Sequence, residues 1–260
     1  MLTVLRKIRK SLIDSSSTQK YLLYAIGEIA LVVIGILIAL QINNWNEERK
    51  RKHQEKKILI EILSDLDHDH LEISSDRNAH RQRIKIVEQL IQDLISGNTH
   101  DSIAQQIFRS SIDNQFYSKS SGFENLKSVG LDIIQNDTIR REITNLYDLT
   151  FQRLIDRGNR HNTIAPITSH LVPYVMKYTG LDPEEEWTMT FDTPVDSVII
   201  PGLRTNPLHN PHEDEQLVLA LQRTLRWRLG KVNYHNITLQ QVENLQSLIH
   251  KELKFQKDIQ

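Results

Sequence analysis

Cysteine is absent from this chain, which excludes disulfides, thiolate metal sites, a cysteine nucleophile and a lipidated N-terminal cysteine. Glycine and proline are scarce, with nine and seven residues, and this scarcity favours helices over β-sandwiches or β-barrels. The sequence also lacks a GxSxG, an SxxK, a P-loop and a Rossmann glycine motif. We therefore expect a protein that is not an enzyme and that needs no cofactor.

Charge is balanced overall, with 32 basic and 33 acidic side chains, but the two signs are separated along the chain. Residues 1–57 hold eleven Lys and Arg against five Asp and Glu, whereas the remainder holds 21 against 28. The basic N-terminal part suits anionic lipid head groups. The acidic remainder argues against a nucleic-acid partner.

A long apolar run follows the first twenty residues. Residues 21–42 contain a single charged side chain, and a helix of this length rises roughly 33 Å, enough for a hydrocarbon core of about 30 Å. Tyr21 and Tyr24 at one end and Trp45 at the other are placed as interfacial anchors. The run predicts a transmembrane helix over residues 21–43. It is expected to be an uncleaved signal anchor, because no small-x-small cleavage site follows it.

The flanks of this run bear on its orientation in the lipid bilayer. Residues 1–20 form a basic segment with apolar side chains every three or four positions, which predicts a short amphipathic helix on the inner leaflet or a disordered basic tail. The two flanks carry five and six Lys and Arg, so the positive-inside rule nearly ties. Because short basic N-terminal tails tend to stay inside, we expect a cytoplasmic N-terminus and a periplasmic C-terminal domain.

One face of the predicted span carries Glu28, Val32, Gly35 and Ala39 at spacings of four and three residues. The small pair Gly35 and Ala39 lets two helix backbones approach, and a carboxyl group on the same face can hydrogen-bond across the contact. We interpret this face as a helix–helix interface with a second copy of the chain or with another membrane protein. Two alternatives stay open: Glu28 bends towards the head groups about one turn away, or it serves a proton or ion pathway.

Beyond the span the pattern stays helical. Residues 44–96 contain no proline or glycine and keep apolar positions at three- and four-residue spacings. This predicts a long helical stalk, either a coiled coil or one arm of a bundle that later helices complete. Residues 97–260 predict a small helical domain, in which Gly130 ends one short helix and Asn136, Asp137 or Thr138 caps the next.

The last third of the chain contains the least regular part. Five prolines interrupt residues 180–212, which predicts a loop insertion with at most short strands. Residues 213–229 and 238–256 predict two helices, and the short connection from Gly230 to Asn236 implies that they are antiparallel. The predicted fold class is therefore mainly α: an N-terminal transmembrane helix that continues into a stalk, then a helical bundle with an irregular proline-rich segment.

Two histidine-containing runs are candidates for metal ligands. In "SDLDHDHLE", residues 64–72, several possible ligand pairs lie three or four residues apart: Asp65 with His68 or Asp69, His68 with Glu72, and Asp67 with His70. None of them has the HExxH spacing, and we interpret the run as a solvated helix face. In "LHNPHEDE", residues 208–215, the acidic residues suit the start of a helix, and we interpret the run as a capped helix terminus. No metal site is assigned.

Two segments resemble a known family: "KIRKSL…KYLLYAIGEIALVVIGILIALQINNWNE" near the N-terminus and "LKSVGLDIIQNDTIRREITNLYD" further on. They are similar to an uncharacterised family of single-span membrane proteins common in Bacteroidota, classed as a domain of unknown function. The resemblance implies a bacterial membrane protein with one N-terminal span and a mostly helical domain. It implies no activity, substrate or catalytic residue.

These observations lead to one expected function and two alternatives. We expect a membrane-anchored, non-catalytic interaction or scaffold protein of the bacterial cell envelope. The first alternative is an extracytoplasmic sensory or ligand-binding helical module. The second is a metal-dependent hydrolase that uses the histidine clusters.

Overall fold

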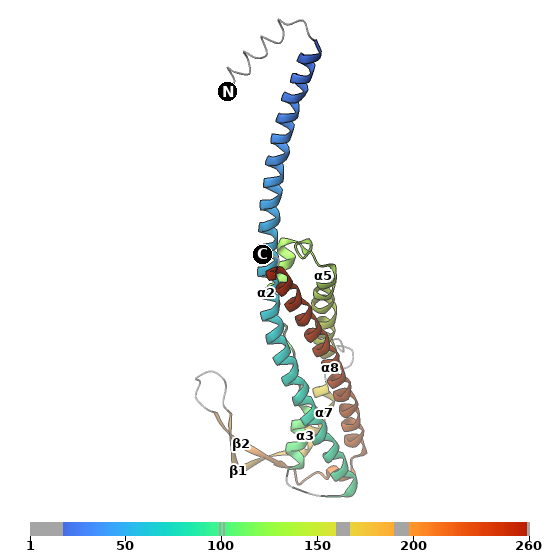
Figure 1. Cartoon of the computed structure of the whole chain (residues 1–260). Helices are drawn as coiled ribbons and strands as arrows, with labels where there is room; N and C mark the ends of the chain where they lie inside the picture. The colour runs from blue at the N-terminus through green and yellow to red at the C-terminus, as the bar shows by residue number, and fades with distance from the viewer. Residues whose placement is uncertain (1–17, 99, 101, 160–166, 190–197, 259–260) are drawn as a thin grey trace. The chain divides into compact units, whose positions relative to one another are not determined.

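The structure is a computed structural model of the chain. It describes residues 18–98, 100, 102–159, 167–189 and 198–258. Most of the predicted amphipathic segment over residues 1–20 therefore lies outside the described residues. The chain divides into two compact units, Met1–Lys57 and Ile58–Gln260, which are described separately below (Figure 1).

The first described element is the helix α2, Thr18–Ser96. It ends where the sequence predicts, because Gly97 takes a positive φ of 71°, a conformation that glycine adopts without steric cost. The N–H of Asn98 then donates to the carbonyl of Asp93 over 3.0 Å and closes the last turn.

Within the first unit, α2 is strongly apolar. From Ala25 onward the helix contains an 18-residue window with a mean hydropathy of 2.5, and none of that window is buried. By length and composition this helix can cross a membrane once. The structure is thus consistent with the predicted single span near the N-terminus.

The second unit contains the rest of α2 and the elements that follow it. They are α3 (Ile103–Ser111), α4 (Ser121–Val129), the 3₁₀-helix η1 (Leu131–Ile133), α5 (Asp137–Thr144), the π-helix η2 (Asn145–Phe151), α6 (Gln152–Asn159), α7 (Ile167–Tyr178), β1 (Thr179–Met189), β2 (Val198–Thr205), the 3₁₀-helix η3 (Pro211–Glu213) and α8 (Glu215–Asp258). The predicted mainly α class is confirmed.

The predicted boundaries around α4 and α5 are confirmed as well. Gly130 follows α4 with a φ of 114°, and its N–H donates to the carbonyl of Leu126. The side chain of Asn136 accepts hydrogen bonds from the N–H groups of Thr138 and Ile139 and so caps α5.

The prediction of two antiparallel C-terminal helices is wrong, since α8 is one continuous helix of 44 residues. Gly230 lies in its interior, where a side chain would have open space. A single glycine costs a helix only about 1 kcal/mol relative to alanine. The buried positions continue at helical spacing on both sides of it, at Leu221, Thr224, Arg228, Lys231, His235, Thr238 and Val242.

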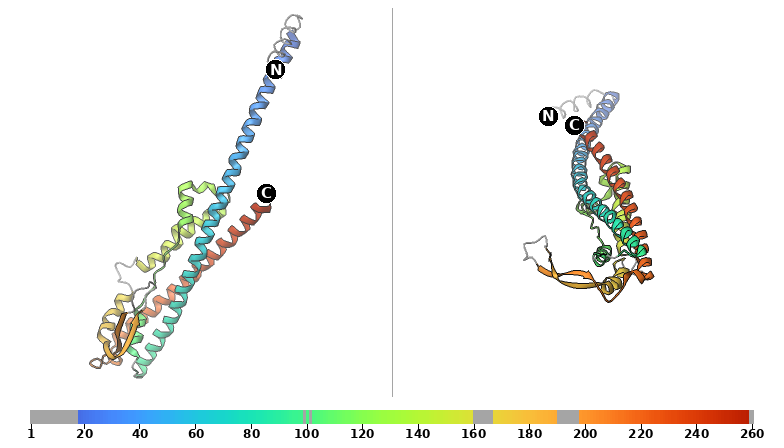
Figure 2. Two further views of the ribbon diagram at one scale, coloured as in Figure 1. Left: turned by 90° about the vertical axis from the view of Figure 1, so that its left-hand side faces the viewer. Right: turned by 90° about the horizontal axis from the view of Figure 1, so that it is seen from below.

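The long helices α2 and α8 lie side by side and antiparallel in the second unit (Figures 1 and 2). Hydrogen bonds along their seam set the register: Asp67 with Gln246, His70 with Glu243, and Arg77 with Asn236. Two apolar cores flank this pair. One joins α2 to α4, α5, η2 and α8, and the other joins the C-terminal part of α2 to α3, α7 and α8.

The proline-rich segment contains an antiparallel hairpin rather than a loop alone. β1 pairs with β2 from Thr179 opposite Thr205 to Met189 opposite Val198, with an irregularity between Asp182 and Glu186. The sequence allows short strands at "WTMTFDT", residues 187–193, and "SVII", residues 197–200. The described parts of these runs, 187–189 and 198–200, lie in β1 and β2.

Candidate functional site

Four carboxylates form a ladder along one face of α2. Asp65, Asp69, Glu72 and Asp76 follow one another at spacings of four, three and four residues, so they lie on one side of the helix. Each accepts a hydrogen bond from the segment 114–122, which therefore runs along α2 in the opposite direction. We call these four residues the carboxylate ladder.

The first member of the ladder holds the start of α4. Asp65 accepts from the hydroxyl of Ser121 at 2.9 Å and from the N–H of Gly122 at 2.6 Å. A Cβ atom at position 122 would lie 2.7 Å from the backbone nitrogen of Ile62, so only glycine permits this close approach of α4 to α2.

The second member is fully buried. Asp69 accepts from the hydroxyl of Ser118 at 3.0 Å and from the N–H of Lys119 at 2.7 Å. Burial raises the pKa of this carboxyl group to about 6, against the opposing effect of the two hydrogen bonds. The nearby Glu72 carboxylate adds to the rise, whereas His68 opposes it.

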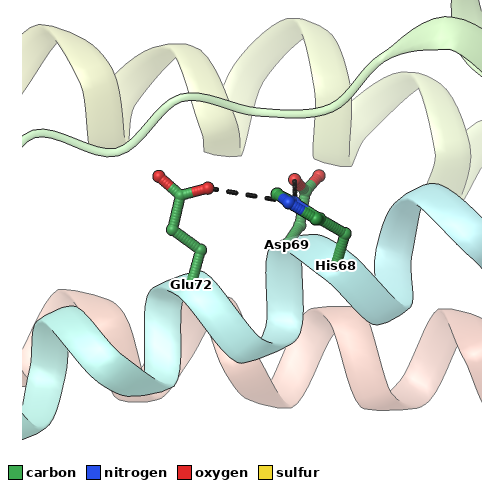
Figure 3. A group of neighbouring side chains, drawn as sticks. All are labelled: His68, Asp69 and Glu72. Carbon is green, nitrogen blue, oxygen red and sulfur yellow. Dashed lines mark ion pairs between the residues drawn. The ribbon is translucent and has the colours of Figure 1, made fainter. Parts of the chain in front are cut away.

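Glu72 and His68 complete a group of three side chains around Asp69 (Figure 3). The Nδ1 atom of His68 lies 3.9 Å from Asp69 Oδ1 and 3.9 Å from Glu72 Oε2. One possible ligand atom from each residue falls within 4.8 Å of the others, and no other such group of three occurs among the described residues. If the protein holds a metal ion within the described ranges, these three residues are the candidates.

A second polar cluster lies between α2 and α8. The guanidinium of Arg228 is fully buried; its Nη2 donates to the carbonyls of Ser110 and Ile112 at 2.8 and 2.7 Å. Its Nη1 lies 3.0 Å from Nδ1 of His80, so the imidazole accepts there and carries its proton on Nε2. Burial lowers the pKa of Arg228 to about 10, which leaves the group charged at neutral pH.

His80 is held neutral in this cluster. Burial lowers the pKa of His80 to about 2, and the nearby charges of Lys231 and Arg228 act in the same direction. Lys231 also pairs with Asp113 at 3.1 Å and lies over the Trp227 ring at 4.3 Å. The cluster fixes α8 against α2 and the end of α3 through buried and half-buried groups.

The second unit also contains a groove of about 240 Å³, lined among others by Tyr117, Phe123, Tyr147 and Gln152. Tyr147 belongs to the π-helix η2, and its ring stacks on Phe123 with the centroids 4.7 Å apart. Its hydroxyl is buried and makes no hydrogen bond with a described residue. The groove therefore presents aromatic and polar side chains together.

The comparison with protein families matches residues 28–169, more than half of the chain, to a family described as Family of unknown function (DUF6090). The chain belongs to the DUF6090 family. No curated protein and no solved structure matches it. The matched range of this DUF6090 chain includes the carboxylate ladder, the segment that the ladder holds, and the groove, whereas α8 lies outside it.

Among the described residues, the predicted membrane-face residues are left uncovered. Glu28, Val32, Gly35 and Ala39 of the DUF6090 chain are all exposed, and a Cβ added to Gly35 would meet nothing within 4 Å. Their role as an interface stays a prediction.

The predicted interfacial anchors are equally untested. Trp45 is exposed. Tyr21 and Tyr24 lie on the described helix, but their side chains are outside the description.

The histidine runs have different outcomes. The solvated-face interpretation of residues 64–72 is wrong for Asp65 and Asp69, which are 2% and 0% exposed, although His68 is exposed. The capped-helix interpretation of residues 208–215 holds in a modified form. The carboxylate of Asp214 accepts from the N–H groups at the start of α8.

Sequence reasoning missed the carboxylate ladder of this DUF6090 chain. The signal was available, because the four acidic positions repeat at the same spacing that identifies an apolar helix face. The positions of their partners could not be read from the sequence, since each partner follows its carboxylate by 38 to 57 residues.

Proposed function

We propose that this protein is a single-pass, membrane-anchored interaction protein of the bacterial cell envelope that lacks catalytic activity. The observation that carries the proposal is the apolar stretch of α2, whose most apolar window is not buried by any described residue. Lipid or another membrane helix covers such a stretch in a membrane. The domain of the second unit then serves as a rigid binding module held by this anchor.

The proposed lack of catalysis is supported by the way the polar groups of the second unit are used. Asp65 and Asp69 bind backbone N–H groups, and Arg228 binds backbone carbonyls. Such buried groups fix the fold, because each would otherwise leave a partner unsatisfied.

We further propose that the face of Glu28, Val32, Gly35 and Ala39 mediates self-association in the membrane. Replacing Gly35 by leucine inserts a large side chain where two backbones approach. We expect Gly35→Leu to weaken self-association of the full chain in a membrane reporter assay. The matched control is Gly27→Leu, which adds the same side chain on another face of the helix. Equal self-association signals from both variants and the parent chain would contradict the proposed interface.

The proposed orientation is tested separately. We expect an enzyme that is active only in the periplasm to work when fused after Gln260. A cytoplasm-specific reporter at the same position should stay silent. The opposite pattern would place the second unit in the cytoplasm and would contradict the envelope assignment.

A second candidate function, a sensory or ligand-binding module, is favoured by the groove near Tyr147. A small molecule that binds there would stabilise the folded state by mass action. Thermal unfolding of the full chain against a metabolite library would identify it. A library that leaves the unfolding temperature unchanged would favour the interaction protein.

A further inference from the structure

His68 does not form an ordinary hydrogen bond with either neighbouring carboxylate. Its Nδ1 atom lies 3.9 Å from Asp69 and 3.9 Å from Glu72, beyond the distance of a hydrogen bond. Two other partly exposed histidine–carboxylate pairs among the described residues are short enough for a hydrogen bond. His70 lies 3.0 Å from its glutamate partner, and His100 lies 3.1 Å from its aspartate. The imidazole of His68 instead lies equally far from two carboxylate oxygens.

The two carboxylate oxygens nearest His68 have lone pairs available to bind a metal ion. Glu72 uses Oε1 to accept from the N–H of Tyr117, which leaves Oε2, the oxygen nearest His68, without a hydrogen bond from a described residue. Asp69 Oδ1 accepts one hydrogen bond, from the N–H of Lys119, and a carboxylate oxygen has a second lone pair. One nitrogen and two oxygens therefore converge with electron pairs to donate (Figure 3).

The spacing fits a small metal ion after a minor adjustment. Zinc binds histidine nitrogen at about 2.0–2.1 Å and carboxylate oxygen at about 2.0–2.2 Å in tetrahedral geometry, so two ligand atoms lie roughly 3.4 Å apart. The two 3.9 Å separations from His68 then need to shorten by roughly 0.5 Å, and the third separation, between the two carboxylates, lies within 4.8 Å. Glu72 and His68 are 27% and 57% exposed at their side chains, so both can move. Buried Asp69 supplies the fixed point.

The surroundings also resemble those of a metal site. The backbone N–H groups of Tyr117 and Lys119 and the hydroxyl of Ser118 hold the two carboxylates, as outer partners do around metal ligands. Asp69 is buried but forms no ion pair with a lysine or arginine among the described residues. The ammonium of Lys119 lies 3.9 Å from Asp65 instead. A divalent ion would compensate the two adjacent negative charges.

We propose that His68, Asp69 and Glu72 bind one divalent metal ion of the zinc class, with water in the outward position. The nitrogen ligand favours zinc over calcium or magnesium, which prefer oxygen alone. Because the same carboxylates hold residues 117–119, the ion strengthens the attachment of that segment to α2. Its role is therefore structural, and it is independent of the proposed interaction function.

The test uses the full chain in lipid nanodiscs, freed of any affinity tag and of metal by chelation. Calorimetric titration with zinc chloride at neutral pH is expected to give one site per chain, and zinc is expected to raise the unfolding temperature. His68→Gln and Glu72→Gln should each weaken zinc binding at least about tenfold, because each removes a direct ligand. Calcium and magnesium chloride should bind more weakly than zinc.

Matched controls come from the same helix. His53→Gln and Glu88→Gln change an exposed histidine and an exposed glutamate outside the group, and both should bind zinc as the parent chain does. The unfolding temperature of each metal-free variant checks that it still folds. Three results would overturn the proposal. The first is no zinc binding by the parent chain, and the second is zinc affinity that neither His68→Gln nor Glu72→Gln weakens. The third is calcium binding as tight as that of zinc.

Discussion

The N–H of Gly122 donates to the carboxylate of Asp65 over 2.6 Å, so a side chain of α2 caps the first turn of α4. Ser120, at the usual capping position, makes no side-chain cap of its own. The first N–H groups of a helix lack partners within the helix, and they attract negative charge. One carboxylate of the ladder therefore fixes both the start of α4 and its distance from α2.

This contact makes glycine necessary at position 122. In Gly122→Ala the new Cβ would lie 2.7 Å from the backbone nitrogen of Ile62 and 2.9 Å from the backbone carbon of Glu61. Backbone atoms cannot turn away, so α4 must move and lose its cap. We expect the free energy of unfolding to fall by about 3 kcal/mol, as for other overpacked sites, measured by chemical denaturation.

The matched control is expected to change the free energy of unfolding in the opposite direction. Gly230 lies inside α8 with open space around it, so Gly230→Ala should raise the free energy of unfolding by about 1 kcal/mol. If the two variants change stability equally, the close approach of α4 and α2 does not exist in solution.

The carboxylate ladder also predicts that two neighbouring aspartates contribute unequally to the stability of the folded protein. Asp65→Ala removes the acceptor for Ser121 and Gly122 and leaves a buried N–H unsatisfied, so we expect a loss of about 2–4 kcal/mol. Asp67 is exposed and accepts a single hydrogen bond from Gln246, so Asp67→Ala should cost less than about 1 kcal/mol. Denaturation of both variants measures the difference. Losses of similar size would show that the ladder is not structural.

The local elements of this fold could be predicted from the sequence, because their signals are local. The end of α2 at Gly97, the stop at Gly130 and the cap by Asn136 all depend on residues next to the boundary. The continuous α8 could not be predicted so easily, since Gly230 is a weak breaker whose effect tertiary packing overrides.

The polar clusters lay beyond sequence reasoning because they join distant segments. The charge pattern of residues 64–72 suits a solvated face, but the return of the chain at residues 114–122 covers Asp65 and Asp69 of this run. Arg228 likewise contacts His80 and Ser110, which lie more than 100 residues before it. A charged residue in a helix is expected at the surface, and nothing near Arg228 indicates otherwise.

Acid should destabilise the second unit through His80. Its pKa in the folded chain is lowered to about 2 by burial, below the value of about 6.5 in an unfolded chain. The unfolded state therefore takes up a proton first, so the stabilisation is complete above pH 6.5 and is lost as the pH falls. At pH 5 the loss is roughly 2 kcal/mol.

The variant His80→Asn isolates this contribution, because asparagine can still accept from Arg228 but cannot be protonated. We expect unfolding free energies measured between pH 7 and pH 5 to fall less for this variant than for the parent chain. Lys231, Arg228 and His235 oppose protonation of His80, whereas Asp113 at 3.7 Å favours it. A parallel pH dependence in both proteins would mean that Asp113 prevails.

The buried hydroxyl of Tyr147 predicts a substitution that stabilises the protein. Burial and the charges of Asp69 and Asp65 raise the pKa of this phenol, so the group stays neutral, and its oxygen makes no hydrogen bond with a described residue. Tyr147→Phe keeps the ring on Phe123 and removes the unsatisfied group, so we expect a gain of about 1 kcal/mol in the free energy of unfolding. The control Tyr117→Phe alters a ring that is 67% exposed and should stay within about 0.5 kcal/mol of the parent chain. A loss of stability in Tyr147→Phe would instead reveal a buried water molecule that bridges the hydroxyl to the ladder.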